Sequence, residues 1–109
     1  MNNKPIRYVG NPGFHDGFIR SVSQTDDKVL VSLAGPTGKR YAVRLDGVST
    51  VESHSPQGMM LYALSEQDID VESLRCYDFI NWHLDQKEER KSKSHLRIVA
   101  SGFTVTKSD

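Results

Sequence analysis

Four histidines are present, and two of them stand beside carboxylates in a way that could support chemistry. His15 precedes Asp16, and His83 lies between Trp82 and the nearby Asp85. Imidazole and carboxylate groups bind divalent transition metals, and a His–Asp pair can also move protons. No His-x-x-x-His spacing occurs, so a metal site would need ligands from distant strands. We therefore predict no metal site and take as candidate binding residues His15, Asp16, Trp82 and His83.

The first pair also has a structural explanation. Asp side chains accept hydrogen bonds from nearby backbone in Asx turns. We therefore expect Asp16 to form such a turn before a strand, and His15 to pack locally. The alternative is a small-ligand-binding or metal-binding domain with hydrolytic activity, whose site would combine His15 and Asp16 with His83 and Asp85.

The other reactive residue types form no catalytic pattern. Cys76 is the only cysteine, which excludes an internal disulfide, and its apolar neighbours predict a buried, unreactive thiol. No Gly-x-Ser-x-Gly sequence is present for a serine nucleophile. The run GPTGKR at 35–40 lacks the spacing and the Ser or Thr of a phosphate loop. We predict no catalytic residue, no enzyme and no cofactor.

Charge is balanced over the chain but uneven along it. The 109 residues, a usual size for one domain, hold 14 basic and 14 acidic side chains. Residues 1–44 carry seven basic and three acidic groups, whereas residues 45–78 carry one basic and seven acidic groups. Such segments lie side by side in a sheet, so we expect cross-strand ion pairs. We therefore do not expect nucleic-acid binding, and we expect the mixed-charge segment Asp85–Ser94 to be a solvated connector.

The N-terminal sequence MNNKPIRYVG lacks the apolar run of a signal peptide. The longest apolar run, Met59–Leu64, is too short to cross a bilayer. These features predict a bacterial cytoplasmic protein without a membrane partner.

Two segments with alternating apolar and polar residues are the clearest signs of local structure. Lys28–Ala34 and Lys39–Asp46 both have the period of two that is typical of half-buried strands. The turn residues 35–38 between them predict a β-hairpin. The residues expected to be buried are Val29, Val31, Leu33, Tyr41, Val43, Leu45, Trp82 and Ile98.

Weaker patterns predict five further strands. Their segments are Gly17–Ser23, Val48–Ser53 after a bend at Gly47, Met59–Leu64, Leu74–Leu84 and His95–Val105. Met59–Leu64 is also compatible with a helix capped by Ser55, but its length favours a strand. The polar stretch Ser65–Ser73 predicts a loop or a single helical turn. A change of parity in the last strand predicts a bulge at Ser101-Gly102 with left-handed glycine geometry.

The expected fold is therefore mainly β, with about seven antiparallel strands in a meander and little helix. Such a meander closes as a sandwich or a partly open barrel. Residues 1–13 form a lead-in segment, residues 14–106 a single β-rich domain, and residues 107–109 a tail.

Five segments together resemble a group of small uncharacterised bacterial β-rich domains. They are HDGFI at 15–19, GKRYAVRLDGV at 38–48, PQGMMLYALSE at 56–66, YDFINW at 77–82 and LRIVA at 96–100. The His-Asp opening of the first strand is also similar to certain all-β immunity proteins that neutralise bacterial toxins. The resemblance covers roughly residues 14–106 and implies the fold more than a function.

These observations lead us to expect a non-enzymatic protein-interaction module, with an immunity-type inhibitor as a narrower version. Edge strands expose unpaired backbone groups to which another chain can add. The expected partner is an unidentified protein, and a homo-oligomer through an edge strand is a further expectation. Leu96–Ala100, with only Arg97 as a charged guard, is the strand that we expect to pair in this way or to be covered by residues 1–13.

Overall fold

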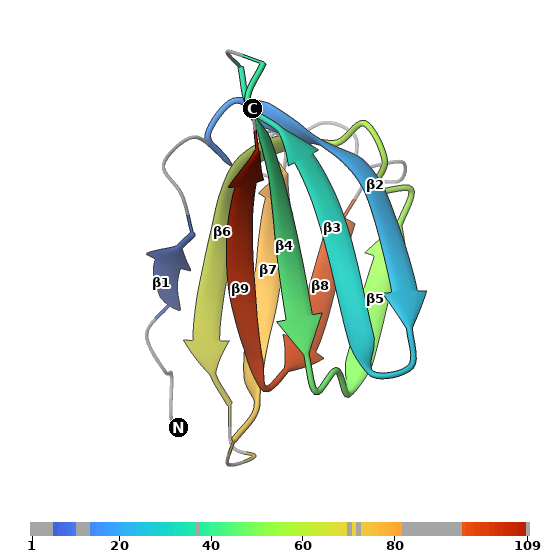
Figure 1. The fold of residues 1–109 in the computed structure, drawn as a ribbon. Helices are drawn as coiled ribbons and strands as arrows, with labels where there is room; N and C mark the ends of the chain where they lie inside the picture. Colours follow the sequence, from blue (N-terminus) through green and yellow to red (C-terminus); the bar gives the residue numbers. More distant parts are fainter. Residues whose placement is uncertain are drawn as a thin grey trace.

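The protein is described here by a computed structural model, which covers residues 6–10, 14–36, 38–69, 71, 73–81 and 95–108. These residues form nine antiparallel strands and no α-helix, so no segment among them is a helix that could span a membrane. The strands are β1 (Ile6–Val9), β2 (Gly17–Thr25), β3 (Lys28–Ala34), β4 (Arg40–Asp46), β5 (Thr50–His54), β6 (Met60–Asp68), β7 (Arg75–Asn81), β8 (His95–Ala100) and β9 (Gly102–Ser108) (Figure 1).

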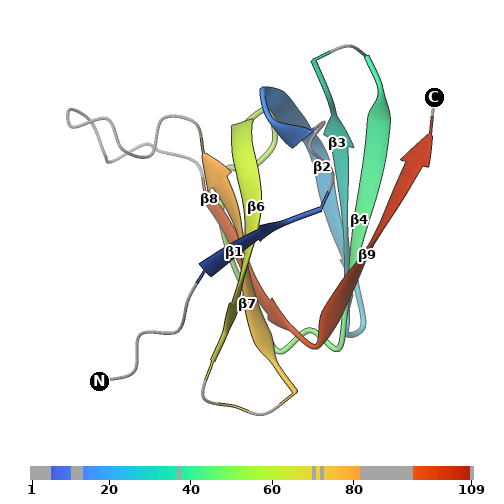
Figure 2. The same ribbon diagram turned by 90° about the vertical axis from the view of Figure 1, so that its left-hand side faces the viewer.

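All nine strands belong to one open sheet. Its order is β5-β8-β7-β6-β2-β3-β4-β9, and β1 adds to β6 beside this path. The sheet bends so that β6, β7 and β8 face β3, β4 and β9 (Figure 2). Inward side chains from both halves meet in one core, where the ring of Tyr77 on β7 lies 5.4 Å from that of Phe103 on β9. The prediction of a mainly β, antiparallel fold is confirmed, with two strands more than expected.

The β3–β4 hairpin forms as the alternation predicts. Val31 is in register with Val43, and the side chains that share their face are buried. Every predicted core residue of this hairpin is buried, and so is Ile98 of β8. Trp82 lies outside the described residues, as do His83 and the segment Asp85–Ser94.

The segment Met59–Leu64 lies mostly in a strand, but β6 is longer than expected. β6 continues to Asp68, so the prediction of a loop or helical turn over Ser65–Ser73 is wrong for its first four residues. These polar residues pair with β7 on one side and largely with β1 on the other. Two of them, Glu66 and Asp68, form ion pairs with Arg7 of the neighbouring strand β1.

The lead-in segment contributes β1, which pairs through residues 6–9 with residues 64–67 of β6. Its pairing partner is therefore β6 and not Leu96–Ala100. That stretch belongs to β8, which lies between β5 and β7, so its assignment as an edge is wrong. The free ends of the strand path are instead β5 and β9, and β9 extends through residues 107 and 108, which were expected to be a tail.

The parity change near the C-terminus has a different cause from the predicted bulge. The chain leaves β8, which pairs with β7, and enters β9, which pairs with β4, after the single residue Ser101. Gly102 is not among the residues with positive φ, so its expected left-handed geometry is wrong. Gly47 does adopt a positive φ of 63°, and there the chain bends from β4 towards β5.

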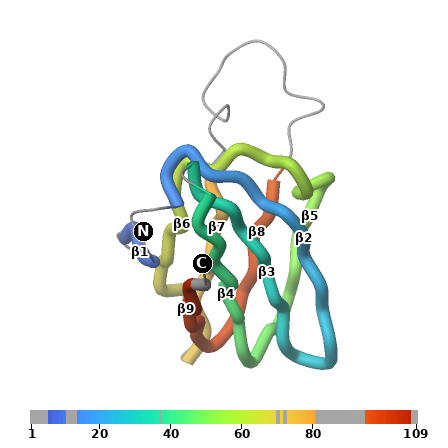
Figure 3. The backbone as a smooth tube through the Cα atoms, turned by 45° about the horizontal axis from the view of Figure 1, so that its top comes forward, coloured from blue at the N-terminus to red at the C-terminus, as the bar shows by residue number. Residues whose placement is uncertain are grey.

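β7 is an interior strand of the sheet, and its core-facing side chains were not among the residues expected to be buried. Tyr77 and Phe79 are the buried side chains, whereas Cys76 and Ile80 are half-buried on the other face. β2 begins beside β6 and then crosses to pair with β3 along most of its length (Figure 3). This crossing joins the two halves of the bent sheet and positions the candidate site.

Candidate functional site

Two different strands share one edge of β6. β2 pairs with Met60 and Leu61, whereas β1 pairs with residues 64–67. Tyr62 lies between these two pairings. On the other edge of β6, the register with β7 shifts between Leu61 and Ala63, which makes Tyr62 the extra residue of a β-bulge. The sheet therefore splits at Tyr62, with β1 on one side of the split and β2 on the other.

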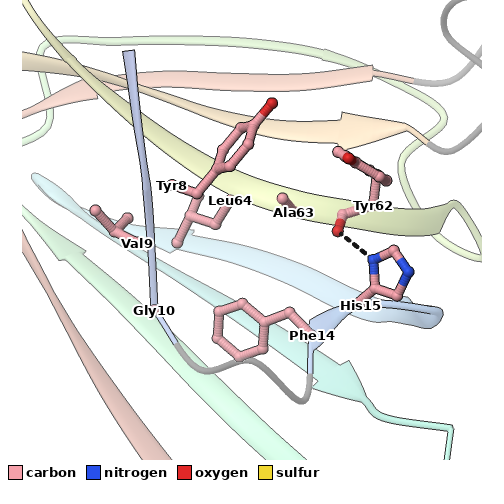
Figure 4. A pocket seen from close by; sticks show the side chains of 8 residues that line it. All are labelled: Tyr8, Val9, Gly10, Phe14, His15, Tyr62, Ala63 and Leu64. Carbon is pink, nitrogen blue, oxygen red and sulfur yellow. Dashed lines mark hydrogen bonds between the residues drawn. The ribbon is translucent and has the colours of Figure 1, made fainter. Parts of the chain in front are cut away.

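A cavity of about 350 Å³ occupies this split (Figure 4). Its apolar lining comes from Val9, Phe14 and Leu64, of which Phe14 and Leu64 are buried in the core. The aromatic rings of Tyr8, His15 and Tyr62 also line it. The cavity therefore combines an apolar base with aromatic side chains that reach solvent.

His15 lines this cavity and contacts the bulged residue. Its Nδ1 lies 3.2 Å from the carbonyl oxygen of Tyr62, and the two rings meet edge to face with centroids 5.3 Å apart. A carbonyl oxygen only accepts, so Nδ1 is the donor in this bond. His15 thus packs against a strand 47 residues away in the sequence, a contact that the expectation of local packing did not include.

Asp16 holds the turn that starts β2. Its φ of 70° is in the left-handed region, which Asp adopts more readily than most residues. Its amide donates to the carbonyl oxygen of Leu61 at 3.0 Å, and its carboxylate lies 3.8 Å from Nε2 of His15. The Asx turn itself stays a prediction.

The described residues do not assemble the alternative metal site. No group of three or more His, Cys, Asp or Glu side chains within the described ranges could hold a metal ion. His83 and Asp85, the other half of the expected ligand set, lie outside those ranges. The structure therefore brings His15 and Asp16 together and leaves the predicted roles of Trp82 and His83 untested.

Large apolar side chains gather on the surface around the split. Tyr8 is 65% exposed, while Phe18, Met60 and Tyr62 are between 38% and 43% exposed. Phe18 is in register with Met60, and the rings of Tyr8 and Tyr62 pack edge to face with centroids 6.1 Å apart. We call Tyr8, Phe18, Met60 and Tyr62 the aromatic surface. Sequence reasoning missed it, because strand pairing alone brings residues 8, 18 and 62 together.

Two arginines border the aromatic surface. Arg40 shares a cross-strand row with Phe18, separated from it only by the small side chain of Ala34. Arg20 follows Phe18 by two residues on β2. Neither arginine belongs to an ion pair recorded among the described residues, whereas Arg7, Arg44, Arg75 and Arg97 all do.

A polar network holds β1, and with it Tyr8, against the rest of the sheet. Glu66 accepts hydrogen bonds from Arg7 at 2.8 Å and from the hydroxyl of Tyr77 at 2.7 Å. Burial would raise the pKa of Glu66, but the bonds from Tyr77 and Arg7 outweigh it and lower this pKa. Burial, together with the Glu66 bond, raises the pKa of Tyr77. Arg7 also reaches Asp68, and that bond lowers the pKa of Asp68.

A second group of polar side chains lies on the outer face of β5, β8 and β7. Arg97 donates to Asp78 at 3.0 Å, and both line a groove of about 280 Å³ with Glu52 and His95. The thiol of Cys76 lies nearby and is half-buried, so the prediction of a buried thiol is wrong; its partial burial raises its pKa.

No family model, curated protein or solved structure matches this chain. The resemblance to small bacterial β-rich domains and to immunity proteins therefore stays a prediction.

Proposed function

We propose that this chain is a non-enzymatic protein-interaction module whose aromatic surface binds an acidic segment of a partner protein. The observation that carries the proposal is the exposure of Tyr8 and Tyr62 at an open cavity, with Phe18 and Met60 exposed on the adjoining pairing of β2 with β6. Contiguous apolar side chains on a protein surface mark sites of interaction. Tyr and other aromatic residues also contribute strongly to binding energy when a partner covers them.

The cavity supports an anchor-in-pocket mode of binding. Its volume of about 350 Å³ is enough for one large side chain of the partner. Val9, Phe14 and Leu64 would surround that side chain with apolar atoms, and Tyr8 and Tyr62 would cover it from the rim. Burying an aromatic side chain in this way contributes about 1.5–3 kcal/mol from the removal of apolar area alone.

The positive charges of Arg20 and Arg40 favour a partner segment that is negatively charged. Both are exposed, and neither belongs to an ion pair within the described part of the chain. Positive groups at the edge of an interface mainly raise the association rate and exclude partners of like charge. An acidic segment with one aromatic or large aliphatic side chain therefore fits both the apolar cavity and the two arginines.

We make two further proposals, one about the fold and one about a more specific function. We take the bent, open sheet as a partly open barrel in which the split between β1 and β2 is the binding entrance. An immunity-type inhibitor would be a specific case, in which the acidic segment belongs to one toxin. The second candidate function is binding of a small apolar ligand, because the cavity volume lies at the lower end of the range for such sites.

Selection from a random peptide display library tests the proposal. We expect the wild-type protein to select peptides with one aromatic or large aliphatic residue flanked by Asp or Glu. Tyr62→Ala and Phe18→Ala should each weaken the selected peptides by at least about tenfold, the equivalent of a 1.4 kcal/mol contact. Leu30→Ala is the matched control, because Leu30 is 43% exposed on β3 and lies outside the aromatic surface.

Equal affinity of wild type and Tyr62→Ala for the selected peptides would contradict the proposal. Replacing both Arg20 and Arg40 by Ala should reduce the association rate and its dependence on salt. If the library yields no ligand while small aromatic compounds bind in the cavity, the second candidate function is the better one.

A further inference from the structure

Two histidines that are 41 positions apart in the sequence meet at a free end of the sheet. His54 is the last residue of β5 and His95 the first of β8, and the two are directly opposite in the antiparallel register. Both are exposed on the outer face. Their rings lie nearly parallel, with an interplanar angle of 19° and centroids 6.0 Å apart.

This spacing is close to what two imidazoles need in order to bind one metal ion. Zn²⁺ binds a histidine nitrogen at about 2.0–2.1 Å, so two coordinated rings have centroids about 5–6 Å apart. Directly opposed residues of an antiparallel pair hold their Cβ atoms about 4.5–5.5 Å apart, so the two imidazole side chains start from neighbouring positions on the same face. Both rings are exposed, so they are free to rotate towards a common ion.

The surroundings favour a cation. Glu52 shares the outer face of β5 with His54, and it lies directly opposite Arg97 of β8 in the antiparallel register. The positive charge of Arg97 is neutralised by Asp78 at 3.0 Å. Among the described residues that line the groove beside His95, two carboxylates therefore accompany one arginine, so the groove carries a net negative charge.

From this geometry we infer that His54 and His95 bind a divalent transition-metal ion that prefers imidazole, of the Zn²⁺, Ni²⁺ or Cu²⁺ type. No third ligand gathers here among the described residues, so water completes the coordination sphere and the affinity is modest. Mg²⁺ and Ca²⁺, which require oxygen ligands, are excluded.

Binding would have a structural consequence for β5. This strand ends the sheet path, and among the described strands it pairs only with β8. An ion held by one residue of each strand cross-links them in the folded state alone, so it stabilises the fold by mass action. The site lies on different strands from the aromatic surface, so its presence or absence leaves the proposed function unaffected.

Titration of the full-length, tag-free protein with Zn²⁺ and Cu²⁺, followed by calorimetry and thermal unfolding, tests this inference. We expect saturable one-to-one binding and a raised unfolding temperature for the wild type. His54→Ala and His95→Ala should each lose both effects, whereas His15→Ala, the matched control, should keep them. Mg²⁺ should have no effect at the same concentration.

Nuclear magnetic resonance of the wild type keeps the test independent of the variants. Zn²⁺ should shift or broaden the imidazole signals of His54 and His95 before those of His15. Absence of binding by the wild type, binding that persists in both variants, or first effects at another histidine would each overturn the inference.

Discussion

Glu66 accepts hydrogen bonds from Arg7 on β1 and Tyr77 on β7, so one carboxylate joins three neighbouring strands. Its side chain is 15% exposed, and a carboxylate so placed is favourable only while its donors remain. The ring of Tyr77 packs in the core against Phe103, which connects this network to the opposite half of the sheet. Tyr8 follows Arg7, so the position of one residue of the aromatic surface depends on this carboxylate.

The lowered pKa of Glu66 predicts a specific loss of stability in acid. A carboxyl group whose pKa is lower in the folded state stabilises the fold above its unfolded pKa of about 4.3, and this contribution disappears as the pH falls through the folded pKa. Glu66→Gln should lower the free energy of unfolding at neutral pH by about 1.5–3 kcal/mol. Urea unfolding at a series of pH values should show a weaker acid dependence for this variant than for the wild type.

Glu52→Gln provides the matched control, because Glu52 is an exposed carboxylate without a recorded ion pair in the described chain. Its effect at neutral pH should remain within about 0.5 kcal/mol. If both variants show the same acid dependence as the wild type, the network does not hold β1 in the way that we describe.

At the scale of single residues, the sequence predicts part of the site. His15 was expected to pack locally and Asp16 to occupy a turn, because both residue types have strong local preferences. Tyr8, Phe14 and Tyr62 were not expected in a site. Their roles depend on the pairing of β1 with β6, which joins residues about 60 positions apart and leaves no local signal.

Among the elements, β2 depends most on a close approach of backbones. Gly17 pairs with Leu61, and a Cβ atom added to Gly17 would overlap the carbonyl oxygen of Ala34. The absence of a side chain therefore lets β2 pass between β6 and β3 and cross from one half of the sheet to the other.

Gly17→Ala should destabilise the protein by about 1–3 kcal/mol, because the overlap is with backbone that cannot rotate away. Gly102→Ala is its control: no atom lies within 4 Å of the added Cβ, and the φ there is not positive. This second change should be neutral or stabilise the fold by up to about 1 kcal/mol. Thermal and urea unfolding give both values, and equal effects would show that β2 can shift away from Ala34.

Strands could be predicted where apolar and polar residues alternate within the strand itself. They could not be predicted where contacts with distant strands stabilise them. The β3–β4 hairpin follows from its period of two and its short turn. The second half of β6 and all of β1 lack such a pattern, because ion pairs such as that of Arg7 with Glu66 replace apolar burial. The division of the last strand into β8 and β9 depends on which half of the sheet each segment joins.

On the scale of the whole molecule, the uneven charge of the sequence resolves largely into cross-strand pairs, as predicted. Arg7 with Glu66, Lys28 with Asp46 and Arg97 with Asp78 each join segments of opposite charge. Arg20 and Arg40 remain outside these pairs, next to the aromatic surface. Exposed apolar side chains and two arginines without an ion pair among the described residues are thus found together near the split in the sheet, and this coincidence is the basis of the proposed function.

The most direct test of that function is to map a selected acidic peptide on the isotope-labelled protein by nuclear magnetic resonance. Our account predicts that the largest chemical-shift changes fall on Tyr8, Phe18 and Tyr62, that the ring signals of Phe14 shift as the cavity fills, and that β5 and β9 are unaffected. Changes confined to the free edges of β5 or β9, with the signals of Tyr8 and Tyr62 unmoved, would contradict it.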